Sequence, residues 1–421
     1  TLANVKEKSF FIKEKSNFKK NFIQYPPALI IANGPSLDKE IEFIKKNQGK
    51  FILFSCGSTL KTLYKNGITP DFHVEIERTK EVYDWLMNIN DIEYFKKIDF
   101  LSLCYIYPKS APLFKRFIWG LKPNDTGEKL LYKILRENRP AIIPHCNPTV
   151  SNGALSIATY LGFKEVYLFG MDMGFRQANY HHSLDSGYYE SQSRFYQPEM
   201  TTDIKIPANF SGEIYSTQEL DNSRLYLEFQ LRSCPEVVCY NCSDGAKIEL
   251  TIPKLSTEIQ SYTEIDKINF IEELITATTE SNQFIDQNKI IHQFYQSYIT
   301  IENLIYLLKM AMTPPPKNRE ELDLVFHQQF STLMQMNQKD PLASGLLMGT
   351  MNYLQCSIFC HLSEITDIDN FNELVQFSFK IIECYLNDML ELTQNHYQTI
   401  DKEINLNPFI QRALETLKMQ G

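Results

Sequence analysis

The chain has 421 residues, of which 43% are hydrophobic and 22% charged, and its formal net charge is −9 at pH 7. This composition is ordinary for a globular protein of two or three domains, and the negative charge argues against nucleic acid or an anionic membrane as a partner. The sequence has no apolar run of the roughly 18 residues that a membrane span needs. Nine irregularly spaced cysteines indicate reduced thiols and a cytoplasmic location. Because the first residue is Thr1 and not Met, an upstream segment stays open.

Residues 1–27 are rich in lysine, with phenylalanines between the lysines. This pattern predicts a helical lead-in that packs on the next domain, or the remnant of a larger N-terminal region.

The stretch from Ala28 to Ser36 joins a five-residue apolar run to Asn-Gly-Pro-Ser, and helical spacing of apolar residues follows from Leu37. The pattern predicts a buried strand, a tight turn and a helix with Ser36 as its N-cap. Gly34 allows the backbone to approach a ligand, and free N–H groups at a helix start favour a phosphate. An ordinary strand-to-helix turn is the alternative.

Residues 28–255 alternate short apolar runs with helical stretches, which is typical of a Rossmann-like α/β domain with a mainly parallel, doubly wound sheet. Strands are predicted at 28–32, 51–55, 72–76, 99–104, 141–143, 165–169 and 236–240. Ligands of such sheets bind beyond the carboxyl ends of the strands. The loops of interest are therefore 33–36, 55–58, 76–79, 144–151, 170–189 and 207–217.

Residues 256–421 show helical periodicity almost throughout and predict an all-helical C-terminal domain. Pro314–Pro316 and Asp340-Pro341 interrupt the pattern. The later helices are predicted at about 317–337, 342–363, 369–397 and 406–418.

A series of motifs in residues 28–255 resembles the motility accessory factors, a bacterial family that glycosylates flagellin. The motifs are Ile30–Leu37, Cys56–Leu60, Gly67–Phe72, Thr149–Ala154, Leu161–Asp172, Tyr180–Ser183 and Tyr240–Ala246. The same core resembles bacterial sialyltransferases that use CMP-sialic acid. The resemblance implies transfer of a nonulosonic acid, of the pseudaminic or legionaminic type, from its CMP-activated form to Ser or Thr of flagellin. It implies no obligatory cofactor and no metal site.

The resemblance also implies a set of residues that bind the nucleotide sugar. They are Asn33, Gly34, Pro35, Ser36, Cys56, Gly57, Glu77, Thr149, Ser151 and Gly153, with Tyr180 as a further hydroxyl donor. Two departures from the sialyltransferases stand out. Cys56 replaces an asparagine, and their general-base histidine has no counterpart in 205–217.

His182 and His181 are the nearest substitutes for that base, because imidazole titrates near neutral pH. Asp172 is a third catalytic candidate, although a carboxylate at the end of a strand often caps a neighbouring loop instead. Glu213 and Tyr215 are the next candidates if the histidines are not the base.

The sequence leaves two other functions open. The core also resembles 6-hydroxymethylpterin diphosphokinases, which would need an acidic metal site for ATP. The missing base allows a flagellin-binding chaperone without turnover. In the glycosyltransferase interpretation, the helical domain is the natural surface for the protein acceptor.

Overall fold

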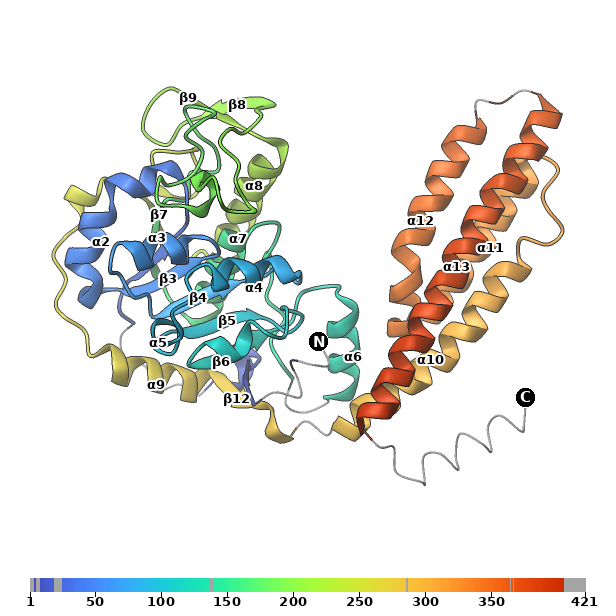
Figure 1. Cartoon of the computed structure of the whole chain (residues 1–421), viewed down its shortest axis with the longest axis horizontal. Coiled ribbons are helices and arrows are strands. Elements are labelled where there is room, and N and C mark those ends of the chain that lie inside the picture. The colour runs from blue at the N-terminus through green and yellow to red at the C-terminus, as the bar shows by residue number, and fades with distance from the viewer. Residues whose placement is uncertain are drawn as a thin grey trace. The chain divides into compact units, whose positions relative to one another are not determined.

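The computed structural model describes residues 4, 8–18, 25–135, 139–284, 287–363, 365 and 367–404 (Figure 1). The chain divides into two compact units, with boundaries at 123/124, 136/137 and 285/286. We call them the core unit and the helical unit. The helical unit combines residues from 286 onward with the short segment 124–136.

The core unit is built on a ten-stranded sheet in the order β11-β10-β7-β2-β3-β4-β5-β6-β1-β12, in which all neighbours are parallel except β1 and β12. The strands are β1 Phe10–Ile12, β2 Ala28–Ile31, β3 Ile52–Cys56, β4 Phe72–Glu75, β5 Asp99–Leu103, β6 Arg116–Gly120, β7 Glu165–Phe169, β10 Val238–Asn241, β11 Ile252–Pro253 and β12 Thr279–Ser281. A separate hairpin pairs β8 Ile204–Pro207 with β9 Glu213–Ser216.

Helices cover both faces of the sheet, so every residue of the central strands β2, β3, β4 and β5 is buried. Ile30 of β2 packs in the cluster that contains α7, whereas Leu29 and Ile31 pack in the cluster on the other face. The α-helices of the core unit are α2 Ile41–Asn47, α3 Thr59–Lys65, α4 Lys80–Met87, α5 Ile92–Phe95, α7 Val150–Leu161, α8 Gln218–Ser233 and α9 Lys267–Thr278. The 3-10 helices are η1 Lys15–Asn17, η2 Pro35–Lys39, η3 Gln48–Lys50, η4 Ala111–Leu113, η5 Gly187–Tyr189, η6 Ser256–Glu258 and η7 Asn282–Phe284.

The strand order reverses beside β2. From β2 the chain adds β3, β4, β5 and β6 in one direction, and later adds β7, β10 and β11 in the other. In open parallel sheets such a switch point leaves a crevice at the carboxyl ends of the two diverging strands. The fold therefore predicts a binding site between the end of β2 and the end of β7.

The helical unit contains four long helices that run side by side (Figure 1). They are α10 Gln287–Met310, α11 Arg319–Lys339, α12 Pro341–Ser363 and α13 Ile368–Ile404. The short helix α6, Thr126–Ile134, packs against α10 and α12. The core of the long helices is apolar, with Leu304, Leu333, Leu347 and Ile382 among its buried residues.

The predicted fold class is confirmed: a Rossmann-like, mainly parallel α/β sheet with an all-helical part. The breaks at Pro314–Pro316 and Asp340-Pro341 separate α10, α11 and α12 as predicted. The predicted helix at 406–418 lies outside the described residues. The predicted strand at 141–143 is reduced to an isolated bridge between Leu121 and Ile142.

The predicted domain boundaries need two corrections. The lead-in 1–27 contains a strand of the sheet, β1, whose Phe11 and Ile12 are fully buried. The predicted boundary at 255/256 is also misplaced, because Leu274 of α9 packs in the hydrophobic core of the core unit and β12 extends its sheet. The core unit thus runs beyond 255, and 124–136 leaves it for the helical unit.

Candidate functional site

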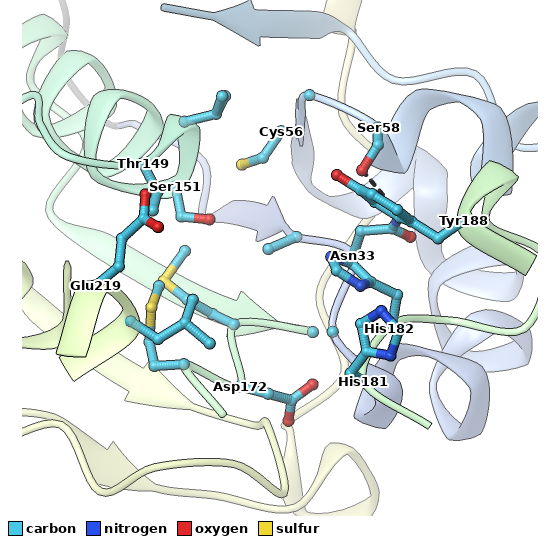
Figure 2. Close-up of a pocket in the computed structure, with 18 of the residues that line it drawn as sticks. Asn33, Cys56, Ser58, Thr149, Ser151, Asp172, His181, His182, Tyr188 and Glu219 are labelled. Atoms are coloured by element: carbon cyan, nitrogen blue, oxygen red, sulfur yellow. Dashed lines mark hydrogen bonds between the residues drawn. The ribbon is translucent and has the colours of Figure 1, made fainter. Parts of the chain in front are cut away.

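A cavity of about 400 Å³ opens at the switch point of the sheet. Its wall is formed by the segments that follow β2, β3, β4 and β7, by the first turns of α7 and α8, and by the loop 170–200 (Figure 2). The lining includes Asn33, Gly34, Cys56, Gly57, Ser58, Glu75, Glu77, Glu81, Trp85, Thr149, Ser151, Asp172, His181, His182, Tyr188 and Glu219.

Ten of the residues predicted from the sequence line this one cavity, although they come from six separate stretches of the chain. They are Asn33, Gly34, Cys56, Gly57, Glu77, Thr149, Ser151, Asp172, His181 and His182. Their predicted roles stay predictions, but the structure brings the residues together.

Four predicted residues do not line the main cavity. Pro35, Ser36 and Tyr180 line a smaller neighbouring pocket of about 170 Å³, which shares Asp172 with the main cavity. Gly153 lies in α7 against the sheet, where an added Cβ would come within 2.6 Å of Ile76. Gly153 is therefore required for the close packing of helix and strand, which makes a ligand-binding role unnecessary.

The predicted phosphate site at the 33–36 turn is wrong in its physical premise. The Gly34 amide donates to the Gly170 carbonyl at 2.8 Å, and the Ser36 amide donates to Asp172 Oδ2 at 3.0 Å. Pro35 has no N–H group to offer. Ser36 is also not the N-cap, since the 3-10 helix η2 begins at Pro35 with Gly34 as its cap residue.

Asp172 occupies the place that the sequence suggested for a phosphate. An added Cβ on Gly34 would lie 2.0 Å from Asp172 Oδ2, so only glycine fits there. Asp172 is 4% exposed, and burial raises the pKa of Asp172 to about 6, although hydrogen bonding from Ser36 opposes the rise. The carboxylate thus caps the neighbouring turn, the alternative that the sequence had left open.

The Asn33 and Thr149 side chains hold the frame of the cavity. Asn33 donates to Ser58 Oγ at 2.9 Å and to Ser186 Oγ at 3.0 Å, and its carbonyl accepts from Thr62 at 3.0 Å. Thr149 caps α7 in a capping box with Asn152. The amides of Asn152 and Gly153 donate to the Thr149 carbonyl at 3.0 and 3.3 Å, and the two residues before them, Val150 and Ser151, line the cavity.

His181 and His182 form a packed pair on one side of the cavity (Figure 2). Both backbone amides donate to the Tyr189 hydroxyl, at 2.8 and 3.0 Å, and the His182 ring stacks on Tyr188 with centroids 4.1 Å apart. Burial lowers the pKa of His181, and burial together with His181 lowers the pKa of His182 to about 3. Both rings are therefore neutral near pH 7.

The acidic residues of the wall outnumber its other ionisable side chains. Glu75, Glu77, Glu81 and Glu219 line the cavity together with Asp172, and none of the described lining residues is Lys or Arg. Partial burial and the neighbouring Glu75 raise the pKa of Glu77. Burial also raises the pKa of the Cys56 thiol, so Cys56 presents a neutral SH group.

Glu75, Glu219 and Trp85 were missed in the sequence analysis, whereas Tyr188 lies in the predicted loop 170–189. Glu75 ends β4 one residue before the predicted loop, and Glu219 lies in α8 two residues after another. Extending each predicted loop by two residues would have found both. Trp85 and Tyr188, with ring centroids 5.0 Å apart, come from α4 and η5 and carry no sequence signal that pairs them. Neither Glu213 nor Tyr215 is among the residues that line the cavity.

The fold and this crevice define a Rossmann-like α/β protein with a cavity at the switch point of its sheet. Residues 2–178 match the model of a family described as 6-hydroxymethylpterin diphosphokinase MptE-like. Comparison with curated proteins gives no match.

Among solved structures, the chain is similar to the MAf glycosyltransferase from Magnetospirillum magneticum AMB-1, with a TM-score of 0.73 and 22% sequence identity. The similarity covers 97% of the present chain and 62% of the longer bacterial protein. The resemblance to motility accessory factors is thus confirmed for the fold. None of the helices in the described part of the chain has both the length and the apolar character of a membrane span.

Proposed function

We propose that the protein is a cytoplasmic glycosyltransferase that moves a nonulosonic acid of the pseudaminic or legionaminic type from its CMP-activated form to Ser or Thr of flagellin, a modification needed for flagellar assembly and motility. The observation that carries the proposal is the convergence of the family's motif residues on one cavity at the switch point. The fold shared with the MAf glycosyltransferase supports it.

The cavity can provide the groups that such a transfer needs. The first turn of α7 lies on the wall, where the hydroxyl groups of Thr149 and Ser151 can donate to a phosphate. Trp85 and Tyr188 provide aromatic surface for a base or a sugar ring. In the reaction, the acceptor oxygen bonds to the anomeric carbon, the bond from that carbon to the phosphate oxygen breaks, and the hydroxyl proton passes to a base on the wall.

The proposed donor can be tested by incubating the protein with flagellin and CMP-activated sugar acids, or with ATP and 6-hydroxymethylpterin. Release of CMP together with a mass increase of flagellin is expected in the first reaction only. Release of AMP in the second reaction would instead favour the pterin diphosphokinase, the alternative supported by the family match of residues 2–178 and by the carboxylates Glu75, Glu77 and Glu219. Flagellin binding without either product would indicate a chaperone.

We further propose that the helical unit binds the protein acceptor. One stripe of α13 faces the core of the unit, with Val375 and Ile382 fully buried. A second stripe at helical spacing is exposed: Leu374 at 41%, Phe377 at 62% and Ile381 at 41%. Contiguous exposed apolar side chains mark surfaces for protein partners.

Replacing Phe377 by Glu is expected to weaken flagellin binding at least tenfold without changing the melting temperature, because Phe377 is exposed. The matched control is Gln376→Glu, which adds the same charge one residue away on the same helix. Binding would be measured by calorimetry or pull-down. Equal binding by the two variants would contradict the assignment of this stripe.

A further inference from the structure

The main cavity poses an electrostatic problem for the proposed donor. A CMP-activated sugar acid carries a phosphodiester and a carboxylate, and both are negative at neutral pH. The described lining of the cavity contains five carboxylic acids and no Lys or Arg. Arg78 and Lys122 partly oppose the rise in the pKa of Glu77, but both lie over the ring of Tyr105 and are not part of the wall.

His181 and His182 are the side chains of the wall that can become cationic. Both rings line the cavity, and two buried ring nitrogens, His181 Nε2 and His182 Nδ1, have no hydrogen-bond partner among the described residues. His181 is 4% exposed. Its Nδ1 lies 3.2 Å from the Ala178 carbonyl and 3.3 Å from the Tyr189 hydroxyl, whereas its Nε2 has neither contact.

From this geometry, and resting on the proposed function, we infer that His181 and His182 form an anion subsite of the main cavity, which takes up a proton from solvent when the carboxylate or the phosphate of the donor binds. A buried polar atom without a partner is costly, and an incoming anionic oxygen supplies the missing partner once the ring is protonated. The positive charge is formed only when an anion is present to balance it.

The surroundings of the pair fit a charge that appears on binding. The hydroxyl of Tyr189 holds both backbone amides, and Tyr188 stacks on the His182 ring. Asp172 lies on the same side of the cavity as the pair (Figure 2), and Glu75 is close enough to Tyr188 to raise the pKa of its hydroxyl. Burial lowers the pKa of both histidines, and His181 adds to the lowering of the pKa of His182. A bound anion opposes that effect directly.

The test is calorimetry with CMP, cytidine and free sialic acid, each in two buffers of different ionisation enthalpy at pH 7.5. CMP or sialic acid is expected to bind with uptake of up to one proton, and its affinity to fall by up to tenfold for each unit of rise in pH from 6.5 to 8.5. Cytidine, which has no anionic group, is expected to bind with no uptake. The anion that shows the uptake, phosphate or carboxylate, is the one that occupies the subsite.

The double variant His181→Gln, His182→Gln is expected to lose the proton uptake and at least tenfold of the affinity for that anion. If cytidine affinity and the melting temperature of the double variant equal those of the wild type, the cavity is intact. His327→Gln, which changes an exposed histidine of α11, is the matched control. Because CMP itself ionises with a pKa of about 6, the variant's titration is subtracted from the wild type's.

Inorganic phosphate separates the subsite from the proposed donor. If CMP fails to bind but phosphate still raises the pKa of the two imidazoles, measured by NMR, the subsite is supported and the CMP donor is wrong. The inference is overturned by anion binding without proton uptake, by uptake that persists in the double variant, or by the absence of any response to CMP, sialic acid and phosphate.

Discussion

Replacing Glu219 by Gln is expected to lower the rate of sugar transfer by about 10² to 10⁴, the usual cost of removing a general base, with little change in donor affinity. Glu219 lies across the cavity from the histidine pair, beside Thr149 and Ser151 (Figure 2). Its side chain is exposed at the first turn of α8 and has no ion-pair partner among the described residues. A histidine pair that is already protonated cannot take up the proton of the acceptor hydroxyl. Among the carboxylates of the wall we therefore propose Glu219, because it lies opposite the histidine pair.

The measurement is CMP release in the presence of flagellin, together with CMP affinity and melting temperature. Glu213→Gln is the matched control, because Glu213 lies on β9 and is not part of the cavity wall. A Glu219→Gln variant with near wild-type turnover would return the role to His182 or His181. The His181→Ala and His182→Ala variants would then lose rate and not donor affinity.

Replacing Asp172 by Asn is expected to remove a pH dependence of stability. The pKa of Asp172 is about 6 in the folded protein and 3.8 for an aspartate in the unfolded chain. Between pH 3.8 and pH 6 the folded state therefore holds a proton that the unfolded state has lost. The stabilisation that protonated Asp172 gives the folded state is therefore fully present below about pH 4 and is lost as the pH rises through 6. The total loss is about 3 kcal/mol of the free energy of unfolding. Asparagine stays neutral and still accepts from the Ser36 amide.

Urea unfolding at pH 4.5 and pH 7 measures about 2 kcal/mol of this loss, because the carboxyl of the unfolded chain is already mostly ionised at pH 4.5. Asp244→Asn is the control of opposite sign, because Arg176 and Lys39 lower the pKa of Asp244, so its contribution is lost as the pH falls. If wild type and Asp172→Asn change equally with pH, Asp172 is not the group that titrates.

Local pattern was enough for the central part of the fold. β2, β3 and β7 contain continuous apolar runs of three or four residues, and such runs are recognisable because both faces of the sheet are covered. β1 and β12 were missed because each has only three residues and pairs at the edge of the sheet with a partner distant in sequence. Their pairing is decided by tertiary contacts, which periodicity does not report.

The candidate site was predictable where its residues follow strands, since parallel strands bring their carboxyl ends to one edge. The hydrogen-bond partners of the site residues could not be predicted from the sequence. Nothing in the local sequence shows that Asp172 reaches across from β7 to the Ser36 amide and fills the turn that follows β2. The acidic character of the wall was also hidden, because Glu75 and Glu219 are 144 positions apart and each is unremarkable alone.

The helical unit is assembled from two stretches of chain that are more than 140 residues apart, since α6 at 126–134 packs against α10 and α12. Truncation of the chain at one position therefore cannot separate the whole helical unit from the core unit. A fragment that ends at residue 285 keeps α6 and removes α10 and α12, the helices that α6 packs against. The helical unit, which we propose binds the acceptor protein, is therefore discontinuous in sequence, with one segment inserted in the chain of the core unit. Unlike a module joined by a terminal linker, it cannot be gained or lost in one step without changing the core unit.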